Sequence, residues 1–322
     1  MTEDNDRHQK KFNNDNDNDN DTGFSFRVNS SRVPLDQDNQ ITSLVSTDDS
    51  WVTLYENVLS SQESNALLHE LHENLPWNVE TDQFGPQTRP TCYFANPDCT
   101  FSYVGLTLDP PAASSNDNNN NDNNDNNWHP TVLKLKDCVT LAVADQLLPP
   151  STTTTTNDSP PPESSPLTAC LVNLYPEEAA TGKGGGGQGF IPWHYDEIRA
   201  HGKDKIVASL SLGGPRRFQL RTRGALNNNS KETPRMVADL WLPSGSILLM
   251  KGEVQENYEH CLPLETKEGG SKEQEEEEAE ESAITINPLR ISLTFRSIVP
   301  GYEKNNHSIP AMDDPCCTDL NE

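Results

Sequence analysis

The segment Arg290–Arg296, with the sequence Arg-Ile-Ser-Leu-Thr-Phe-Arg, alternates strictly between polar and apolar side chains. Successive side chains of a β-strand point to opposite faces of the sheet, so Ile291, Leu293 and Phe295 would form one apolar face. The two arginines would share the other face, and an arginine that is buried without a partner is costly. The segment therefore predicts a strand with a hydrophobic core on one side and an acidic ligand on the other. The alternative is that the arginines face solvent.

Further short strands are expected from about residue 168 onward, where alternating or apolar runs are separated by Gly and Pro turns. Many short strands with such turns are typical of a β-sandwich or a jelly roll. We therefore predict a mostly β fold with flanking helices. The expected strands span residues 169–175, 190–196, 206–212, 217–221, 236–242, 246–250, 252–258 and 290–298.

Two helices are expected before this strand region. The first begins at Ser60, because Ser60 and Glu63 have the spacing of a capping box, in which each side chain accepts a hydrogen bond from the other residue's backbone N–H. The second begins at Pro130, since proline suits the first helical position. Both continue with apolar residues at helical spacing. These residues are Leu67, Leu68, Leu71 and Leu75 in the first helix and Val132, Leu135, Val139 and Val143 in the second.

The chain of 322 residues is long enough for one large domain with tails. Residues 1–49 are polar and contain an Asn/Asp run, so they are expected to be a disordered tail that buries too little apolar surface to offset its ordering entropy. The domain is expected to span residues 50–300, with a C-terminal tail at 301–322. Low-complexity inserts are expected to form surface loops, which a stable core tolerates. They lie near residues 112–127, 150–166, 182–189 and 265–282.

The motif His194-Tyr195-Asp196 places an imidazole and a carboxylate two residues apart, and therefore on one face of a strand. Two His and one carboxylate form the facial triad of non-haem Fe(II) oxygenases, which leaves coordination positions open for a co-substrate and O2. His260 is the expected third ligand, with His129 and His201 as alternatives. The H-x-D pattern is weak by itself, because it also occurs by chance on protein surfaces.

The two arginines of Arg290–Arg296 would have Cα atoms about 20 Å apart, at about 3.3 Å per residue. Their long side chains leave room for a short diacid, and guanidinium groups bind carboxylates bidentately. Asn173 and Tyr175 share a strand face in the same way. The order N-x-Y, H-x-D, His and R-x5-R therefore favours an Fe(II)- and 2-oxoglutarate-dependent oxygenase over a set of unrelated surface residues.

The formal net charge of −26 is unevenly distributed. Residues 265–281 hold nine Glu and two Lys, whereas residues 196–235 hold nine Lys or Arg and four acidic residues. An acidic surface repels the phosphates of nucleic acids, but the region beside the predicted metal is basic. Its basic residues form either a phosphate-contacting rim or a solvated strand edge. They are Arg199, Lys203, Lys205, Arg216, Arg217, Arg221 and Arg223.

Seven cysteines, none of them in a C-x-x-C pair, indicate reduced thiols in a reducing compartment. No apolar run approaches the length of a membrane span, and the first residues do not resemble a signal peptide. We therefore expect an intracellular protein without a membrane partner.

Together these motifs resemble the AlkB family of Fe(II)/2-oxoglutarate dioxygenases, in particular its nucleic-acid demethylases. The resemblance covers roughly residues 50–300 and is clearest over 167–299. It implies a double-stranded β-helix (jelly roll) core. It also implies oxidative demethylation of N-alkylated DNA bases, such as 1-methyladenine and 3-methylcytosine, with release of formaldehyde, succinate and CO2. The segments that carry the resemblance are residues 101–105, 171–175, 192–197, 206–213, 245–250 and 290–296.

The resemblance also implies roles for individual residues. Those that would hold iron are His194, Asp196 and His260. Those that would bind 2-oxoglutarate are Asn173, Tyr175, Arg290, Thr294 and Arg296. On the substrate side, Tyr103 would stack on the flipped base and Arg89 would belong to the nucleotide-recognition lid. Phe84 would enter the base stack as a wedge.

One position departs from the family pattern. Nucleobase demethylases of this family usually carry an acid two residues after the metal Asp, where this chain has Ile198. The adjacent Glu197 is therefore kept as a candidate substrate-binding residue.

The favoured substrate is alkylated DNA, with RNA or a methylated protein as alternatives. A non-catalytic nucleic-acid-binding module is the alternative from another class. A role in DNA repair implies a nuclear location, with the cytoplasm as the other possibility, and the chain is expected to be a monomer.

Overall fold

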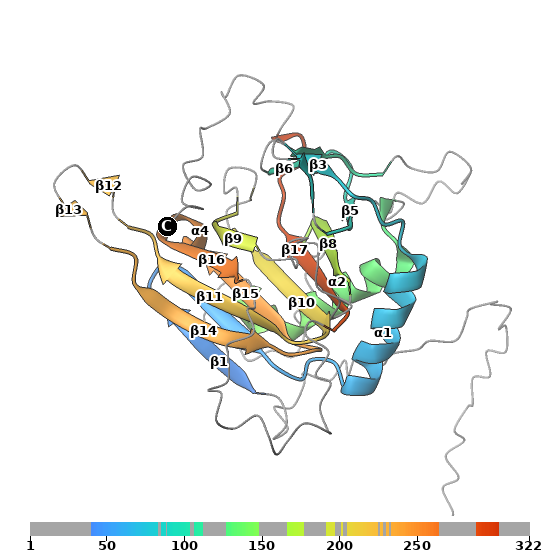
Figure 1. Ribbon diagram of the computed structural model, residues 1–322, viewed down its shortest axis with the longest axis horizontal. Helices are drawn as coiled ribbons and strands as arrows, with labels where there is room; N and C mark the ends of the chain where they lie inside the picture. Colours follow the sequence, from blue (N-terminus) through green and yellow to red (C-terminus); the bar gives the residue numbers. More distant parts are fainter. Residues whose placement is uncertain are drawn as a thin grey trace, which may run out of the picture.

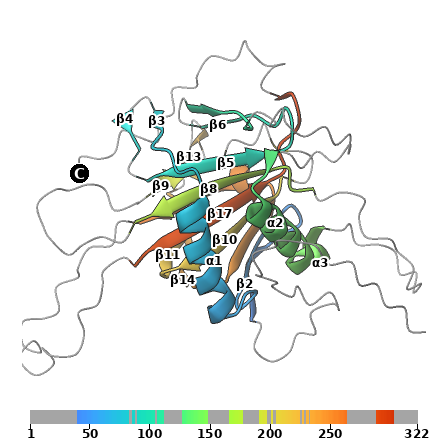
Figure 2. The same ribbon diagram turned by 90° about the vertical axis from the view of Figure 1, so that its right-hand side faces the viewer.

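The structure is a computed structural model (Figure 1), and it describes residues 40–82, 85–87, 89–103, 106–111, 127–147, 166–176, 191–196, 201, 205–224, 226–227, 230–231, 233–263 and 288–302. Within these residues two β-sheets face each other, and helices cover the outer face of the larger sheet (Figure 2). No helix in these ranges is long and apolar enough to cross a membrane.

The larger sheet has seven strands, and neighbouring strands run antiparallel. In spatial order they are β1 (Ile41–Ser46), β2 (Ser50–Tyr55), β15 (Ile247–Gly252), β10 (Val207–Gly213), β17 (Arg290–Arg296), β8 (Ala169–Tyr175) and β5 (Thr91–Ala95). The smaller antiparallel sheet contains β14 (Met236–Leu242), β11 (Arg216–Thr222), β16 (Tyr258–Leu262) and β9 (Ile191–His194). Three short pairs complete the described strands: β3 (Thr81–Asp82) with β4 (Gly85–Pro86), β6 (Phe101–Tyr103) with β7 (Leu106–Leu108), and β12 (Leu226–Asn227) with β13 (Ser230–Lys231).

The chain passes back and forth between the two main sheets. Strands β8 and β10 belong to the larger sheet, while β9 and β11 belong to the smaller one. After β14 the alternation resumes, with β15 and β17 in the larger sheet and β16 in the smaller. This winding is that of a double-stranded β-helix, or jelly roll. The predicted fold, mostly β with flanking helices around a jelly-roll core, is confirmed.

Strand β17 divides its side chains between two environments, as its alternation predicts. Ile291, Leu293 and Phe295 are completely buried in the cluster formed with the helices. On the opposite face Arg290 and Arg296 point into the interior between the sheets, where both are also buried. The pairing of β17 with β8 and with β10 has no register shift, so the apolar and the polar side chains stay on their own faces along the whole strand.

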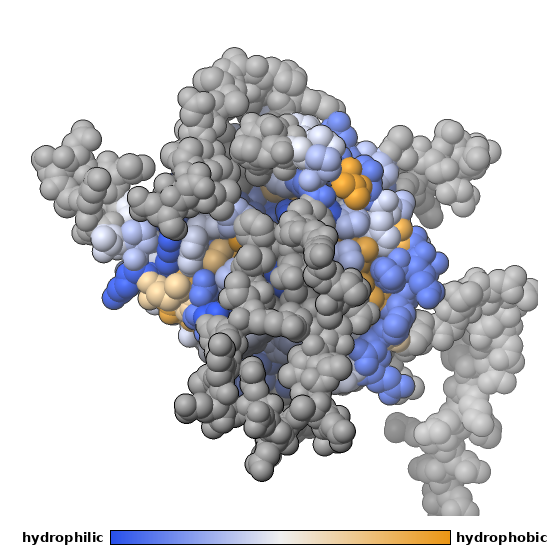
Figure 3. Space-filling model, viewed as in Figure 1, coloured by the Kyte–Doolittle hydropathy of each residue, from blue (hydrophilic) through white to orange (hydrophobic). Residues whose placement is uncertain are grey.

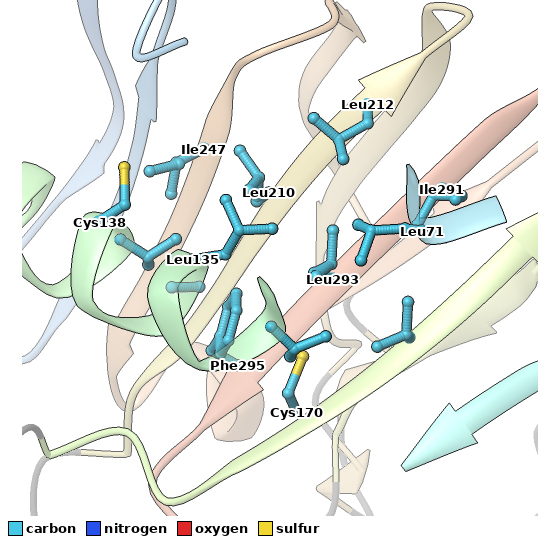
Figure 4. Packing of buried hydrophobic residues seen from close by; sticks show 14 of the residues in the cluster. Leu71, Leu135, Cys138, Cys170, Leu210, Leu212, Ile247, Ile291, Leu293 and Phe295 are labelled. Carbon is cyan, nitrogen blue, oxygen red and sulfur yellow. The ribbon is translucent and has the colours of Figure 1, made fainter. Parts of the chain in front are cut away.

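Helices α1 (Ser61–Asn74) and α2 (Pro130–Ala142) pack on the apolar face of the larger sheet (Figure 4). Ser60 and Glu63 form the predicted capping box, with the Ser60 N–H 2.9 Å from the Glu63 carboxylate. Leu71 of α1 and Leu135 of α2 are completely buried against β17 and its neighbours. The remaining helices, α3 (Ala144–Leu147) and α4 (Val254–Asn257), are single turns.

The interior between the sheets is apolar on one side and polar on the other. Beneath β2 and β15, residues such as Leu54 and Met250 meet Phe218 and Leu220 of the smaller sheet. Beneath β10, β17 and β8, the inner faces carry hydroxyl, amide and guanidinium groups. These are Ser209, Ser211, Ser292, Thr294, Asn173, Arg290 and Arg296. A binding site is therefore expected on the polar side of the interior.

The strand predicted at residues 252–258 is wrong. Strand β15 ends at Gly252, α4 follows, and the next strand is β16 at Tyr258–Leu262. Gly252 has a φ of 77°, and a Cβ at this position would lie 2.1 Å from the Asp49 carbonyl oxygen. The chain leaves the sheet here because the close approach of another backbone segment requires a glycine in the left-handed region.

The predicted start of the domain near residue 50 is too late. Strand β1 at Ile41–Ser46 falls within the predicted tail, and it pairs with β2 with Val45 buried between the sheets. The sequence Ile-Thr-Ser-Leu-Val-Ser lacks a strict alternation, so its pairing with the neighbouring strand β2 decides its structure. Residues 1–39 and 303–322 lie outside the described ranges, as do the predicted inserts apart from residues 127 and 166.

We expect the substitution Leu135→Ala to lower the free energy of unfolding by about 2–5 kcal/mol, because it leaves a cavity at a completely buried site. Leu141→Ala in the same helix is the matched control, since Leu141 is 56% exposed, and its effect should stay within about 0.5 kcal/mol. Urea denaturation followed by circular dichroism measures both. Equal effects of the two substitutions would contradict the packing of α2 on the sheet.

Candidate metal centre

Three candidate ligands meet between the two sheets. His194 ends β9, Asp196 follows two residues later, and His260 lies in the neighbouring strand β16. The antiparallel register places His260 directly opposite His194, with ring centroids 4.2 Å apart. The ligand atoms of the three side chains all lie within 4.8 Å of one another. This is the only such cluster of three or more His, Cys, Asp or Glu among the described residues.

Hydrogen bonds orient two of these ligands. Nδ1 of His194 lies 2.8 Å from the Pro192 carbonyl oxygen, so Nδ1 carries the proton and Nε2 is left as the ligand atom. The Asp196 backbone N–H donates to Oε1 of Gln255 at 2.9 Å. The His260 ring stacks on Phe218, with centroids 5.8 Å apart and an interplanar angle of 26°. The donor set is therefore held in place by its surroundings.

The protonation states suit a divalent cation. Burial and the adjacent His194 lower the pKa of His260 to about 3, and burial also lowers the pKa of His194. For Asp196, burial raises the pKa, but the Arg296 guanidinium and the nearby histidines outweigh it and hold the pKa well below its usual range. At neutral pH both imidazoles are thus neutral and the carboxylate is ionised, as metal ligands must be.

Arg296 is the charge partner of Asp196. Its Nη2 donates to Oδ1 of Asp196 at 3.0 Å, in an ion pair whose side chains are each 8% exposed. Its guanidinium also lies over the Phe101 ring, with Cζ 4.6 Å from the centroid. The buried Nε has no hydrogen-bond partner among the described residues. An oxygen of an acidic ligand beside the metal would satisfy this donor, so the residues present fit both a divalent metal and a bound carboxylate.

Arg290 occupies a different place on the same strand face. It is 2% exposed, its Nη2 donates to Oγ of Ser211 at 3.0 Å, and its Cζ lies 5.0 Å from the centre of the Tyr175 ring. Tyr175 is its register partner in β8, and Asn173 stands opposite Ser292 in the same pair of strands. Thr294 lies between the two arginines and its hydroxyl is 3.2 Å from that of Ser209. The predicted 2-oxoglutarate residues therefore line one continuous polar strip.

Tyr103 and Arg89, which were predicted to lie on the substrate side, border this strip. The Tyr103 hydroxyl donates to Oε1 of Gln87 at 3.2 Å, and its ring stacks on Phe101 at 5.6 Å. Phe101 in turn lies under Arg296, so contacts run from Tyr103 to the metal carboxylate. Arg89 donates from Nε to Oδ1 of Asn173 at 3.0 Å.

Sequence reasoning missed Phe101, Gln87 and Gln255. The i, i+2 rule applied to Tyr103 in β6 would have found Phe101, whereas Gln87 lies outside the strands. Gln255 had no such signal, because its segment was interpreted as a strand. The predicted residues Phe84 and Glu197, together with Ile198, lie outside the described ranges.

The alternative third ligands are not in the cluster. His129 caps α2, where its Nδ1 accepts a hydrogen bond from the Thr131 N–H at 3.3 Å. His201 is buried and forms a β-bridge with Ile298. The structure brings only His260 to His194 and Asp196.

The basic residues near the site are largely paired with acids. Arg217 binds Asp239 through two hydrogen bonds, Arg221 binds Glu259 at 2.8 Å, and Lys205 pairs with Glu256. Arg216 is buried, and Arg199 and Lys203 lie outside the described ranges. In Figure 3 the described surface on this side of the molecule is mostly hydrophilic, with hydrophobic residues in small separate patches. Arg217 and Arg221 therefore form partly exposed ion pairs on β11, between β14 and β16, and this agrees better with a solvated strand than with a free phosphate-binding rim.

We expect the metal-stripped protein to lose about 2 kcal/mol of unfolding free energy through His260 as the pH falls from 7 to 5. The folded pKa of about 3 lies below the unfolded value near 6.5, so the unfolded state takes up the proton first and acid destabilises the fold. Urea denaturation at the two pH values measures the loss.

His260→Gln should remove that part of the pH dependence, while the exposed His69→Gln should leave it unchanged. A His260→Gln variant with the full pH dependence of the parent would contradict the burial of a neutral imidazole.

Comparison with known proteins agrees with this geometry. Residues 51–296 match the sequence profile of the 2OG-Fe(II) oxygenase superfamily. The human alpha-ketoglutarate-dependent dioxygenase alkB homolog 3 is 25% identical over 262 residues, which cover 80% of this chain and 70% of the relative. The bovine protein of the same name is 24% identical over the same shares.

Solved structures show weaker similarity. The structure of OsALKBH1 overlaps with a TM-score of 0.41 and 18% identity over 76% of this chain and 97% of that one. An oxidoreductase of the 2OG-Fe(II) oxygenase family from Burkholderia pseudomallei overlaps with a TM-score of 0.39 and 10% identity, over 76% and 84% of the two chains. By the match of its sequence over most of the domain, the chain belongs to the 2OG-Fe(II) oxygenase superfamily, as an AlkB-like 2-oxoglutarate-dependent dioxygenase that uses Fe(II) and O2.

Proposed function

We propose that this dioxygenase removes methyl groups from N-alkylated bases of the 1-methyladenine and 3-methylcytosine type in DNA. The observation that carries the proposal is the row of contacts from Tyr103 through Phe101 and Arg296 to Asp196. These contacts connect Tyr103 to Asp196 through two intervening side chains, which supports the binding of an unstacked base on the Tyr103 ring. The sequence resemblance to nucleic-acid demethylases supports the same substrate class.

In this proposal His194, Asp196 and His260 hold Fe(II). When bound, the iron supplies the activation of O2 that oxidises the methyl group while 2-oxoglutarate becomes succinate and CO2. The methyl carbon leaves as formaldehyde and the base nitrogen is restored, so one O2 and one 2-oxoglutarate are consumed for each methyl group. The ion pair with Arg296 keeps the Asp196 carboxylate ionised and in one orientation.

The two arginines divide the binding of 2-oxoglutarate. Arg290, buried beside Ser211 and Tyr175, binds the carboxylate that is distant from the metal. Arg296 pairs with Asp196, and its buried Nε, which has no partner among the described residues, would donate to the carboxylate at that end. Asn173 and Thr294 lie between them and provide polar contacts along the diacid. Burial of Arg290, Arg296 and Asn173 strengthens each of these charged hydrogen bonds.

The substrate base must leave its stack to reach the metal, since a base inside a duplex cannot approach a buried site. Tyr103 offers a ring for stacking, and Phe101 behind it keeps that ring in place. Arg89 contacts Asn173 and therefore joins the substrate side to the 2-oxoglutarate side of the pocket. Single strands and damaged duplexes cost less to open, so they are the favoured substrates.

We expect the full chain, with Fe(II), ascorbate and 2-oxoglutarate, to demethylate a single-stranded DNA oligonucleotide that carries 1-methyladenine. Mass spectrometry measures the loss of the methyl group and the formation of succinate. His194→Ala should reduce methyl loss by at least about 100-fold, because it removes a metal ligand. The exposed His69→Ala is the matched control and should retain full activity.

Two further outcomes of this assay separate the alternatives. Succinate without methyl loss would keep the oxygenase and reject this substrate, and the same assay on methylated RNA or a methylated protein would follow. Neither product would favour a non-catalytic nucleic-acid-binding module. In that case Fe(II) and 2-oxoglutarate together should also fail to raise the melting temperature.

We expect Tyr103→Ala to raise the KM for the methylated oligonucleotide by about 5- to 150-fold, since base–aromatic stacking contributes about 1–3 kcal/mol. Tyr103→Phe keeps the ring, loses only the hydrogen bond to Gln87, and should change KM much less. Steady-state kinetics with the two variants provide the comparison. Equal KM values for all three proteins would remove Tyr103 from the substrate site.

Two expectations from the sequence remain predictions within this proposal. The chain acts as a monomer, which size-exclusion chromatography with light scattering measures. It resides in the nucleus, as repair of DNA requires, and fluorescence microscopy of the tagged full chain tests this location.

A further inference from the structure

Asp196 differs from the two histidines in how its backbone is held. His194 and His260 lie in paired strands, whose ladder fixes their positions. Strand β9 ends at His194, so Asp196 lies beyond the ladder. A ligand outside a strand needs tertiary contacts to keep its geometry.

The first contact comes from Gln255 in α4. This side chain is 1% exposed, and its Oε1 accepts the Asp196 backbone N–H at 2.9 Å. Its Nε2 lies 3.6 Å from Sδ of Met250, inside the core between the sheets. A completely buried amide is thus used to hold the backbone of the metal carboxylate.

The second contact comes from Arg223, just after β11. Its Cζ lies 3.9 Å from the centre of the Tyr195 ring, next to Asp196 in sequence. Its Nη1 lies 3.3 Å from the carbonyl oxygens of both Gln255 and Glu256. Carbonyl groups in the last turn of a helix have no partner within the helix, so the guanidinium satisfies them and joins α4 to Tyr195.

Two further bonds attach α4 to the same region. The Arg223 backbone N–H donates to the Asn257 carbonyl oxygen at 2.9 Å, and Glu256 pairs with Lys205. Both Tyr195 and Asp196 are therefore tied to one helical turn, which is itself fixed by Arg223.

We propose that Gln255 is a positioning residue that sets the orientation of Asp196 for metal binding, and that Arg223 holds α4 in place for this task. The inference rests on the proposed role of Asp196 as an iron ligand. Loss of the Gln255 acceptor leaves the histidine pair intact but releases the backbone of the third ligand. Residues that orient metal ligands in this way affect metal affinity by about 10- to 100-fold.

The test uses the full chain and Co(II) as the probe, with the Kd from titration and the visible absorption spectrum as readouts. Gln255→Met keeps a similar volume without a comparable acceptor, and it should weaken Co(II) binding by about 10- to 100-fold and alter the spectrum. Gln62→Met, at an exposed site in α1, is the matched control and should leave both readouts unchanged. A Kd within about twofold of the parent for Gln255→Met would overturn the inference.

Melting temperatures without metal separate positioning from folding. A lower melting temperature together with an unchanged Kd and spectrum indicates a purely structural role and overturns the proposal. If Gln255→Met does not fold, Arg223→Lys tests the proposal instead. Arg223 is half-buried, and this substitution removes its contacts with the Gln255 and Glu256 carbonyl oxygens and its stacking on the Tyr195 ring. Weaker Co(II) binding at an unchanged melting temperature supports the proposal, and unchanged binding overturns it.

Asp196→Ala distinguishes this inference from the proposed function. If Asp196→Ala binds Co(II) as tightly as the parent, the metal assignment itself is wrong. If Asp196→Ala loses binding while Gln255→Met retains it, only the positioning role is rejected.

Discussion

The buried ion pair between Arg296 and Asp196 connects the two halves of the molecule. Arg296 belongs to the larger sheet, whereas Asp196 follows a strand of the smaller one, so the pair joins the sheets across the interior. Removing two charges from water is expensive, and attraction offsets this cost only when the geometry is good and other donors are satisfied. Here the pair keeps the carboxylate ionised beside two neutral imidazoles. An ionised carboxylate beside two neutral imidazoles favours the binding of a divalent cation, and the buried guanidinium favours the binding of an acidic ligand.

The two histidines and Asp196 are held in position in different ways. Antiparallel pairing of β9 and β16 sets one histidine opposite the other, so their separation follows from strand geometry. Asp196 depends on contacts from α4 and β17, which are distant in sequence. The core behind β17, formed with α1 and α2, keeps the arginine face directed inward. Rigid strands and one anchored turn thus produce a preorganised ligand set.

Much of this arrangement could be predicted from local patterns. The alternation in Arg290–Arg296 indicated both the core face and the polar face, and the structure shows both. The capping box at Ser60 also formed as expected.

Other predictions from local patterns were wrong. The pattern at residues 252–258 predicted a strand, but the positive φ of Gly252 turns the chain out of the sheet and into α4. Strand β1 carried too little alternation to be recognised, since its partner β2 determines its pairing. The ion pairs of Arg217 with Asp239 and of Arg221 with Glu259 were also not predicted, because the acidic partners are distant in sequence.

Local sequence patterns specify which side chains share a strand face, where the helices begin and which residue types are available to bind iron and a diacid. These properties depend on near neighbours in the chain, through the period of two in strands and the capping of the first helical turn. Tertiary packing is what brings His260, and neither His129 nor His201, into the cluster with His194 and Asp196. The same packing pairs Arg296 with Asp196 while Arg290 lies apart from it, and it brings Gln255 to the backbone N–H of Asp196. The physical reason is that sheet pairing and packing join residues from distant parts of the chain, and no local spacing specifies which of several equivalent side chains will meet.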